Sequence, residues 1–107
     1  MHLVIRKFPR LHSVKDAAQR AETGLMTLLK KSPGFLGYSI FDAGGGVGGS
    51  VTFFKDRDSA LAANALALAW INESLPDLFD GQPEIMISEV LYCGGLVTPP
   101  ADVVQQS

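Results

Sequence analysis

Apolar residues recur with strand-like spacing in some segments of the chain and with helix-like spacing in others. The order of these segments predicts the order of the structural elements. Short apolar runs of four to nine residues are typical of strands, whereas apolar residues three and four positions apart indicate a helix. Ser13 is a predicted N-cap for the first helix, and Pro33-Gly34 stops it. The predicted elements are strand 2–8, helix 13–31, strand 35–42, strand 51–54, a helix from Asp56 or Asp58 to about Leu75, and strand 84–92.

The segment between the second and third predicted strands, residues 43–49, contains five glycines, which predict a flexible hairpin loop. Gly44, Gly46 and Gly49 also spell the G-x-G-x-x-G spacing of dinucleotide-binding turns. Such a turn must open a helix, whose N-terminus faces the phosphates. A strand follows here, so the loop interpretation is preferred.

The element order is strand, helix, strand, strand, helix, strand, which predicts the α+β, ferredoxin-like βαββαβ fold. Right-handed crossovers then give a four-stranded antiparallel sheet with both helices on one face. We expect one domain over residues 1–93 and a C-terminal tail over 94–107, either flexible or packed on a partner.

The predicted strands are apolar on both sides, whereas a sheet with one wet face should alternate apolar and polar residues. In the second strand, Phe35 and Phe41 share one parity and Leu36, Tyr38 and Ile40 the other. The helices can cover only one face, so the other face predicts a homodimer that packs sheet against sheet. The second helix is apolar nearly all round, so we expect it to be buried on more than one side or to line a cavity.

Composition and charge limit the kinds of partner that this chain can bind. Charged residues are only 19% of the 107-residue chain, and the net charge is −2. Lys and Arg are scattered, which argues against a nucleic-acid or anionic-membrane surface. No apolar run reaches the ~20 residues of a membrane span. The single cysteine, Cys93, excludes an internal disulfide and fits a reducing compartment, so we expect a cytoplasmic protein.

Three segments together resemble a known family. They are Pro33-Gly34-Phe35-Leu36-Gly37-Tyr38, Ser50-Val51-Thr52-Phe53-Phe54-Lys55-Asp56, and Ala69-Trp70-Ile71. Over residues 1–93 the chain resembles the dimeric α/β-barrel superfamily, in particular its antibiotic-biosynthesis-monooxygenase-like domains. The resemblance implies a homodimer with a cavity between sheet and helices in each subunit.

Members of that superfamily include cofactor-independent oxygenases of aromatic polyketides, haem-degrading enzymes and small isomerases. The chain departs from the haem-degrading branch, because it lacks the Asn, Trp and His set of that branch. Trp70 has no histidine near it in sequence. We therefore expect no cofactor, and two histidines are too few for a histidine-based metal site.

Six residues are candidates for a site. His2, Arg6 and Tyr38 are the candidate catalytic residues, and Phe54, Asn64 and Trp70 are the candidate substrate-binding residues. Each also has a plainer interpretation. His2 would be structural or solvated, and Tyr38, Phe54 and Trp70 would belong to the core or the interface. Asn64 would lie on a helix surface, and Arg6 would pair with Glu84 or Glu89.

The sequence favours a domain that acts on, or binds, a small apolar or aromatic metabolite, for example as a cofactor-independent monooxygenase. The alternative is a non-catalytic dimerising module for ligand binding or stress response. Cavity volume distinguishes them: about 300 Å³ or more, with Arg6, His2 or Tyr38 on the wall, favours the enzyme. A cavity with room for only a few waters opposes it.

Overall fold

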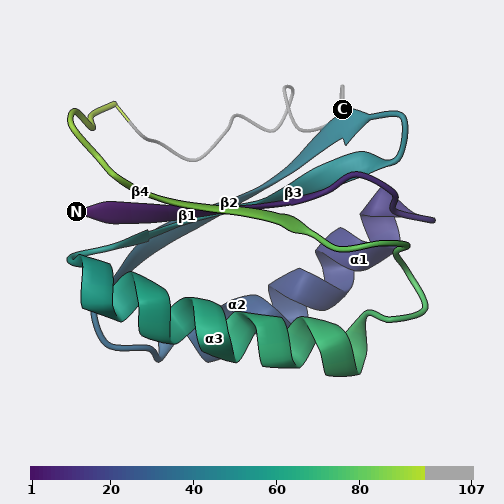
Figure 1. Cartoon of the computed structure of the whole chain (residues 1–107), viewed down its shortest axis with the longest axis horizontal. Coiled ribbons are helices and arrows are strands. Elements are labelled where there is room, and N and C mark those ends of the chain that lie inside the picture. The colour runs from purple at the N-terminus through teal and green to yellow at the C-terminus, as the bar shows by residue number, and fades with distance from the viewer. Residues whose placement is uncertain (96–107) are drawn as a thin grey trace.

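A computed structural model describes residues 1–95 of the chain. The described elements are the strand β1 (His2–Phe8), the helical segments α1 (Val14–Arg20), η1 (Ala21–Leu25) and α2 (Met26–Lys30), the strands β2 (Phe35–Gly44) and β3 (Val47–Phe54), the helix α3 (Arg57–Ser74) and the strand β4 (Glu84–Glu89). Their arrangement is shown in Figure 1.

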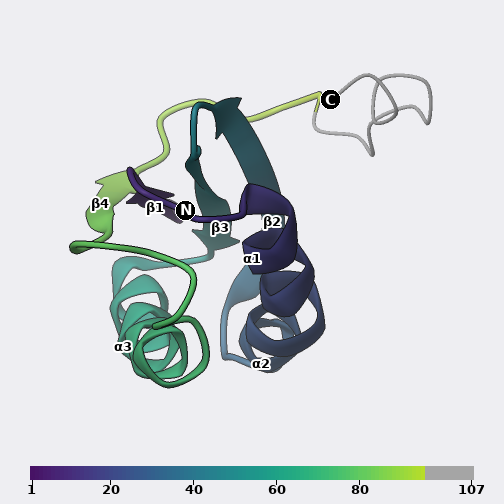
Figure 2. The same ribbon diagram turned by 90° about the vertical axis from the view of Figure 1, so that its right-hand side faces the viewer.

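The four strands form one antiparallel sheet in the order β2-β3-β1-β4. Figure 2 shows the sheet edge-on, with α3 and the α1–η1–α2 helix both on the same side of it. The two central strands, β1 and β3, are therefore each covered by a helix. The predicted ferredoxin-like α+β fold is confirmed.

The β2–β3 hairpin has longer strands and a tighter turn than predicted. The prediction of a flexible loop over residues 43–49 is therefore wrong. Both strands continue into the glycines, and Gly45 and Gly46 form the turn. Gly44, Gly45 and Gly46 all have positive φ, at 85°, 63° and 80°. Positive φ at both turn residues suits the tight turns that join antiparallel strands. Gly49 has no room for a side chain, because a Cβ there would collide with the carbonyl oxygen of Arg6 on β1.

The first helix begins as predicted, with Ser13 Oγ accepting a hydrogen bond from the Asp16 backbone N–H at 3.2 Å. It is not uniform, because the π-helical turn η1 interrupts it at residues 21–25. Gly24 lies in this turn, and a Cβ on it would be 2.5 Å from Cζ2 of Trp70 on α3. Gly24 thus allows one helix to pack closely against the other.

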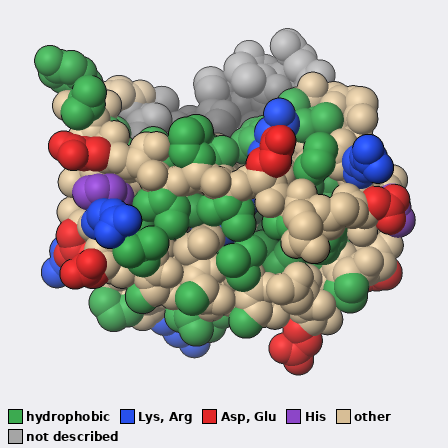
Figure 3. Space-filling view, viewed as in Figure 1, with side chains coloured by type: hydrophobic (Ala, Val, Ile, Leu, Met, Phe, Trp, Pro, Cys, Tyr) green, Lys and Arg blue, Asp and Glu red, His purple; other side chains and the backbone are tan. Residues whose placement is uncertain are grey.

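The core lies between the sheet and the helices. On α3 the buried positions form a stripe of small side chains, Ala60, Ala63 and Ala67, which ends at Ile71. Of the two predicted alternatives for this helix, burial on more than one side does not apply within the protomer, since Leu61 and Leu66 stay 38% and 47% exposed, but Ile71 does line a cavity. Figure 3, seen from the same direction as Figure 1, shows hydrophobic side chains on the side of the molecule where α3 lies.

The sheet face away from the helices is also apolar, as predicted. Val4 and Phe8 of β1 are buried under the helices, so the alternate residues Leu3 and Ile5 point the other way. The register sets Leu3 beside Phe53, and Ile5 beside Val51 and Met86. These neighbours form a continuous apolar strip across β3, β1 and β4, named here the outer strip.

The C-terminal part differs from the prediction in one respect: β4 ends at Glu89, not at residue 92. Leu91 and Tyr92 follow it and are 78% and 96% exposed. Of the predicted tail over 94–107, residues 96–107 lie outside the described part of the chain. None of the helices within residues 1–95 has the length and apolar character needed to span a bilayer.

Candidate functional site

A small cavity lies between the first helix and the sheet. Its volume is about 40 Å³, which is room for roughly three waters at about 10–15 Å³ each. The helix side and the α3 end of its wall are apolar, formed by Leu11, Val14, Ala17, Ala18, Ala21, Leu25, Ile71 and Leu75. The sheet side is formed by Arg6, Phe8, Ile40, Phe41, Gly49 and Ser50. Small residues on both sides leave the space open.

Arg6 is the charged residue of this wall, and it is fully buried. Its Nε donates to Asn64 Oδ1 at 3.1 Å, and Nη1 donates to Thr52 Oγ1 at 3.4 Å. Nη2 has no hydrogen-bond partner among the described residues. Burial lowers the pKa of Arg6 to about 10, so the guanidinium is still charged at neutral pH.

The predicted ion pair between Arg6 and Glu84 or Glu89 is absent from the described structure. Glu84 instead lies 3.6 Å from Lys7 Nζ, which points to the opposite face of the sheet from Arg6. Glu89 pairs in register with His2, at the far end of β1, and is exposed. The neutral oxygens of Asn64 and Thr52 therefore replace the expected carboxylate.

The other two candidate catalytic residues are not part of the cavity wall. His2 is half-buried at the start of β1, and its Nδ1 has no partner among residues 1–95. The Tyr38 hydroxyl donates to Glu22 Oε2, and the Lys30 Nζ lies 5.2 Å from the centre of the Tyr38 ring. The hydrogen bond to Glu22 raises the pKa of Tyr38, which keeps the phenol protonated.

Of the three candidate substrate-binding residues, only Asn64 reaches Arg6. Phe54 is fully buried in the core, where its ring packs edge-on against Phe35 at 5.9 Å. Trp70 lies over Gly24 between the helices. The structure thus brings Arg6 and Asn64 together and leaves His2, Tyr38, Phe54 and Trp70 apart from the cavity wall.

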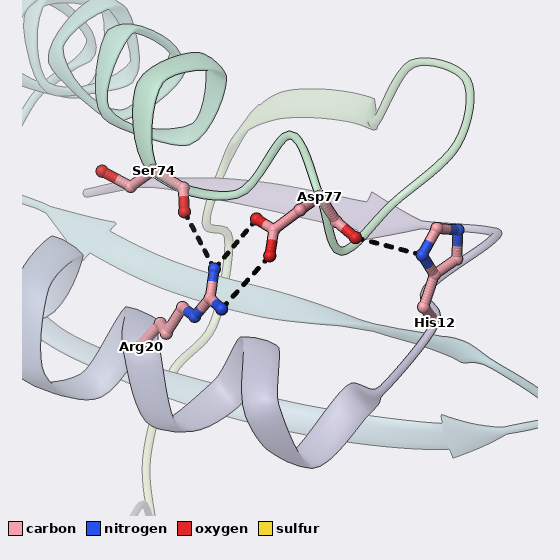
Figure 4. Close-up of polar contacts among 4 residues, drawn as sticks. All are labelled: His12, Arg20, Ser74 and Asp77. Carbon is pink, nitrogen blue, oxygen red and sulfur yellow. Dashed lines mark hydrogen bonds and ion pairs between the residues drawn. The ribbon is translucent and has the colours of Figure 1, made fainter.

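The turn between α3 and β4 closes one end of the cavity. Leu75 lies in the wall, Leu78 is buried, and Phe79 forms a bridge with Leu11. Two polar contacts fasten this turn to the first helix region (Figure 4). Arg20 on α1 donates from Nη1 and Nη2 to the Asp77 carboxylate, at 3.0 and 3.2 Å, and from Nη1 to the Ser74 carbonyl oxygen.

His12 makes the second contact with this turn. Its Nδ1 lies 3.1 Å from the Asp77 carbonyl oxygen and its Nε2 lies 2.9 Å from Asp80 Oδ2. Both oxygens are acceptors, and a neutral imidazole has only one N–H, so only the imidazolium satisfies both contacts. The hydrogen bond to Asp80 accordingly raises the pKa of His12.

The donor set of the cavity limits its chemistry. Its wall contains one guanidinium and one hydroxyl, on Arg6 and Ser50, and its residues include no carboxylate, imidazole or phenol. The surface of the cavity is almost wholly apolar and Arg6 is fully covered, so the wall presents neither an accessible cation nor a base. No group of three or more His, Cys, Asp or Glu within residues 1–95 is placed to hold a metal ion. A haem does not fit this wall, which supplies no iron ligand and has little volume.

Two residues that make polar contacts in this region, Thr52 and Asp80, were not singled out from the sequence. Thr52 shares a face of β3 with Ser50 and Phe54, and its hydroxyl faces Arg6. Strand parity could have placed it beside Arg6, but the register was needed to show it. Asp80 lies 68 residues after His12, and no local signal joins the two.

Comparison with known proteins identifies the fold. No protein-family model matches the sequence, and no curated protein sequence matches it. Solved structures do match. A protein of unknown function from Nitrosomonas europaea has a TM-score of 0.71 at 15% identity, over 91% of this chain and 95% of that one.

Two further structures come from oxygenase-related proteins. One is described as a candidate antibiotic biosynthesis monooxygenase from Nitrosomonas europaea, with a TM-score of 0.68 at 19% identity, over 86% of this chain and 100% of that one. The other is a variant of SnoaB, a cofactor-independent oxygenase from Streptomyces nogalater, with a TM-score of 0.67 at 14% identity, over 86% and 94% of the two chains. The predicted resemblance is confirmed at the level of the fold: the chain has the fold of antibiotic-biosynthesis-monooxygenase-like domains.

Proposed function

We propose that this chain binds a small apolar or aromatic metabolite in the cavity between its first helix and its sheet. The observation that carries the proposal is the cavity itself, which has an apolar wall with a single charged residue, Arg6. Ligand sites are typically apolar with a few placed polar groups. At about 40 Å³ the cavity has room for only a few waters, which by the volume criterion given above opposes the enzyme interpretation. Binding must therefore widen it.

The proposed unit is a homodimer, in which the outer strips of two protomers cover one another. Support comes from Leu3, Ile5, Val51, Phe53 and Met86, which form an apolar surface with no helix over it. If about 800 Å² per protomer is covered, as in interfaces of standard size, burial at ~25 cal/mol per Å² gives of order 20 kcal/mol per protomer before association costs. We also propose a cytoplasmic location, on the basis of the single cysteine.

Cofactor-independent oxygenation is the second candidate function, and the fold shared with SnoaB favours it. The reaction balances without a reductant when a CH2 group beside a carbonyl becomes C=O. The substrate gives up four electrons and two hydrogens, one atom of O2 enters the product, and the other leaves as water. Stabilisation of the enolate by Arg6 would require the cavity to widen toward its covered guanidinium. The proton would pass to water, because the cavity wall holds no base. For that reason we rank binding above oxygenation.

The first test is binding of benzamide, a small neutral aromatic probe, measured by calorimetry and by NMR shifts of cavity residues. We expect millimolar or tighter binding to the wild type. Ala18→Leu should abolish it, because the added side chain fills the space on the helix side. The same samples in an oxygen electrode, with anthrone as the acidic CH2 substrate, test the second candidate.

Ala65→Leu is the matched control, because Ala65 is exposed on α3 and outside the cavity wall. It should bind benzamide like the wild type. Equal binding by the Ala18→Leu protein would contradict the proposed site. Enzyme-dependent oxygen uptake that survives Ala18→Leu would place oxygenation elsewhere.

A further inference from the structure

The helical segment α1, which forms much of one side of the cavity, buries very little of its own surface. Of its seven residues only Ala17 is buried, while Val14 and Ala18 are half-buried at the cavity. The segment α2 differs, because Met26 and Leu29 are fully buried. A segment with few buried apolar contacts opens at a lower free energy than the rest of a fold. The part of the wall that α1 forms is therefore weakly packed.

The π-helical turn η1 separates α1 from the well-packed α2. At its end the Met26 backbone N–H donates to the carbonyl oxygen of Ala21, five residues back. Such turns interrupt the regular α-helix and are frequent at functional sites. Gly24 in this turn lies against the Trp70 ring on α3, and Leu25 is buried, so the position of η1 is fixed. The turn thus provides a pivot at the C-terminal end of α1.

A single charged contact fastens α1 at this end. Arg20, the last residue of α1, donates from Nη1 and Nη2 to the Asp77 carboxylate and from Nη1 to the Ser74 carbonyl oxygen. The side chains of Arg20 and Asp77 are 45% and 62% exposed. Because exposed ion pairs contribute little to stability, this contact can break and re-form readily. It has the properties of a latch.

We propose that α1 is a lid on the cavity, which moves away from the sheet when Arg20 releases Asp77 and closes when the two pair again. The helix moves between two fixed points. One is η1, and the other is Leu11, whose backbone N–H donates to the Gly46 carbonyl oxygen at 2.8 Å. The inference rests on the proposed function in one respect: the open form is the widened cavity that a ligand needs.

Labelling of a buried thiol measures this opening without any ligand. Ser50→Cys, in a Cys93→Ser background, places a thiol on the sheet side of the cavity, where Ser50 is 6% exposed. Iodoacetamide should reach it by local opening, so the labelling rate should depend only weakly on urea. Ala63→Cys is the matched control, because Ala63 is buried outside the cavity wall. Its thiol should react at least about tenfold more slowly, with a steep urea dependence.

Arg20→Gln tests the latch. Loss of one exposed ion pair should raise the labelling rate of the Ser50→Cys protein about twofold to fivefold. Lys15→Gln is the control: it removes an exposed charge from the same helix, and Lys15 forms no ion pair within residues 1–95. It should leave the rate unchanged. An unchanged rate in the Arg20→Gln protein would overturn the proposal, because the opening would not then involve the latch.

Amide hydrogen exchange of the wild type locates the motion. Movement of α1 about η1 breaks the hydrogen bond from the Met26 N–H to Ala21. The Met26 amide should therefore exchange with the same weak urea dependence as the thiol labelling. The Asp80 amide, which donates to the Arg10 carbonyl oxygen at 3.0 Å in the turn after α3, should stay protected. Weak urea dependence at Asp80 instead of Met26 would mean that this turn opens and that α1 is not the lid.

Benzamide binding separates the lid from the proposed function. In the Arg20→Gln protein the affinity should rise by the same factor of about two to five, since the open form is more populated. Local opening at Ser50→Cys without any benzamide binding would contradict the proposed function and leave the lid standing. Steep urea dependence with normal benzamide binding would do the reverse. Should Ser50→Cys fail to fold, the Met26 amide of the wild type still decides.

Discussion

Small residues determine where this protomer has space and where its helices touch. Ala17, Ala18 and Ala21 line the cavity on the helix side, whereas Gly24, one turn further on, faces the ring of Trp70. The same helix thus leaves a void beside the sheet and makes a close contact beside α3. Which of these a small residue provides depends on the partner that the fold sets opposite it.

Replacing Gly24 by Ala should lower the stability of the protein. Alanine favours a helix by about 1 kcal/mol over glycine, but its Cβ would lie 2.5 Å from Cζ2 of a packed indole ring. Overpacking of this kind costs about 1–3 kcal/mol, so after the helix gain of about 1 kcal/mol we expect a net loss of up to about 2 kcal/mol in the free energy of unfolding, measured with urea.

Gly37→Ala is the control for this substitution, because a Cβ at Gly37 has no heavy atom within 4 Å. Gly37→Ala should leave the midpoint of urea unfolding nearly unchanged. Trp70→Phe should rescue part of the Gly24→Ala loss, since it removes the colliding ring. A stabilised Gly24→Ala protein would mean that the indole moves away at little cost.

At the scale of elements, the turn after α3 is held to the start of the first helix by charge. Arg20 binds Asp77, and His12 binds Asp80 and the backbone of Asp77. The buried side chains Leu75 and Leu78 of the same turn pack at the end of the cavity. These polar contacts therefore position part of the cavity wall.

The stability of this attachment should depend on pH in a defined window. The hydrogen bond to Asp80 raises the pKa of His12, so its contribution is complete below the ordinary value of 6.5 and is lost as pH rises through the raised value. The hydrogen bonds from Arg20 lower the pKa of Asp77. Its contribution is complete above the ordinary value of 3.8 and is lost as pH falls through the lowered one. Both contributions are present between these two values.

Urea unfolding of the wild type and His12→Ala at pH 5.5 and 8.5 checks this prediction. The advantage of the wild type over His12→Ala should be larger at pH 5.5. Asp77 carries the only other charge that acts on His12 besides Asp80 within residues 1–95, and Arg20 holds Asp77 ionised at both pH values. An advantage that is equal at both pH values, or larger at pH 8.5, would show that His12 is bound as the neutral form.

At the scale of the whole molecule, two apolar surfaces are candidates for self-association. The outer strip crosses the middle of the sheet, and Leu61 and Leu66 lie on α3. Only the outer strip joins side chains of three adjacent strands into one surface, which makes it the better candidate for self-association.

Val51→Glu should convert the proposed dimer into a monomer. Val51 lies in the outer strip on β3, beside Ile5, and a carboxylate there would be buried without a partner in the dimer. Sedimentation equilibrium at micromolar concentration measures the mass directly. Leu66→Glu on α3 is the control and should stay dimeric. A monomeric wild type would contradict the homodimer, whereas a monomeric Leu66→Glu protein would move the interface to α3.

Much of the fold follows from local patterns that the sequence contains. Ser13 and Asp56 cap the helices as short-range rules predict, and Gly34, with φ of 78°, follows the end of the first. The hairpin was mispredicted for a physical reason: glycine disfavours strands in general, but here the Arg6 backbone leaves no room for a side chain at Gly49. That contact joins residues 43 positions apart.

The candidate site was predicted only in part, because a pair of residues is a site only when the fold joins them. Arg6 and Asn64 were both singled out, but their hydrogen bond spans 58 positions and links a strand to a helix. The expected carboxylate partner of Arg6 was wrong because Glu84 and Arg6 lie on opposite faces of the sheet.

By itself, the sequence determined the element order, the helix caps and the apolar character of both sheet faces, since each depends on residues close together in the chain. Only the tertiary structure decided the size of the cavity, the π-helical turn over Trp70 and the uncompensated charge of Arg6. These depend on packing and on which distant side chains meet, and a buried charge is defined by the partners it lacks as much as by those it has.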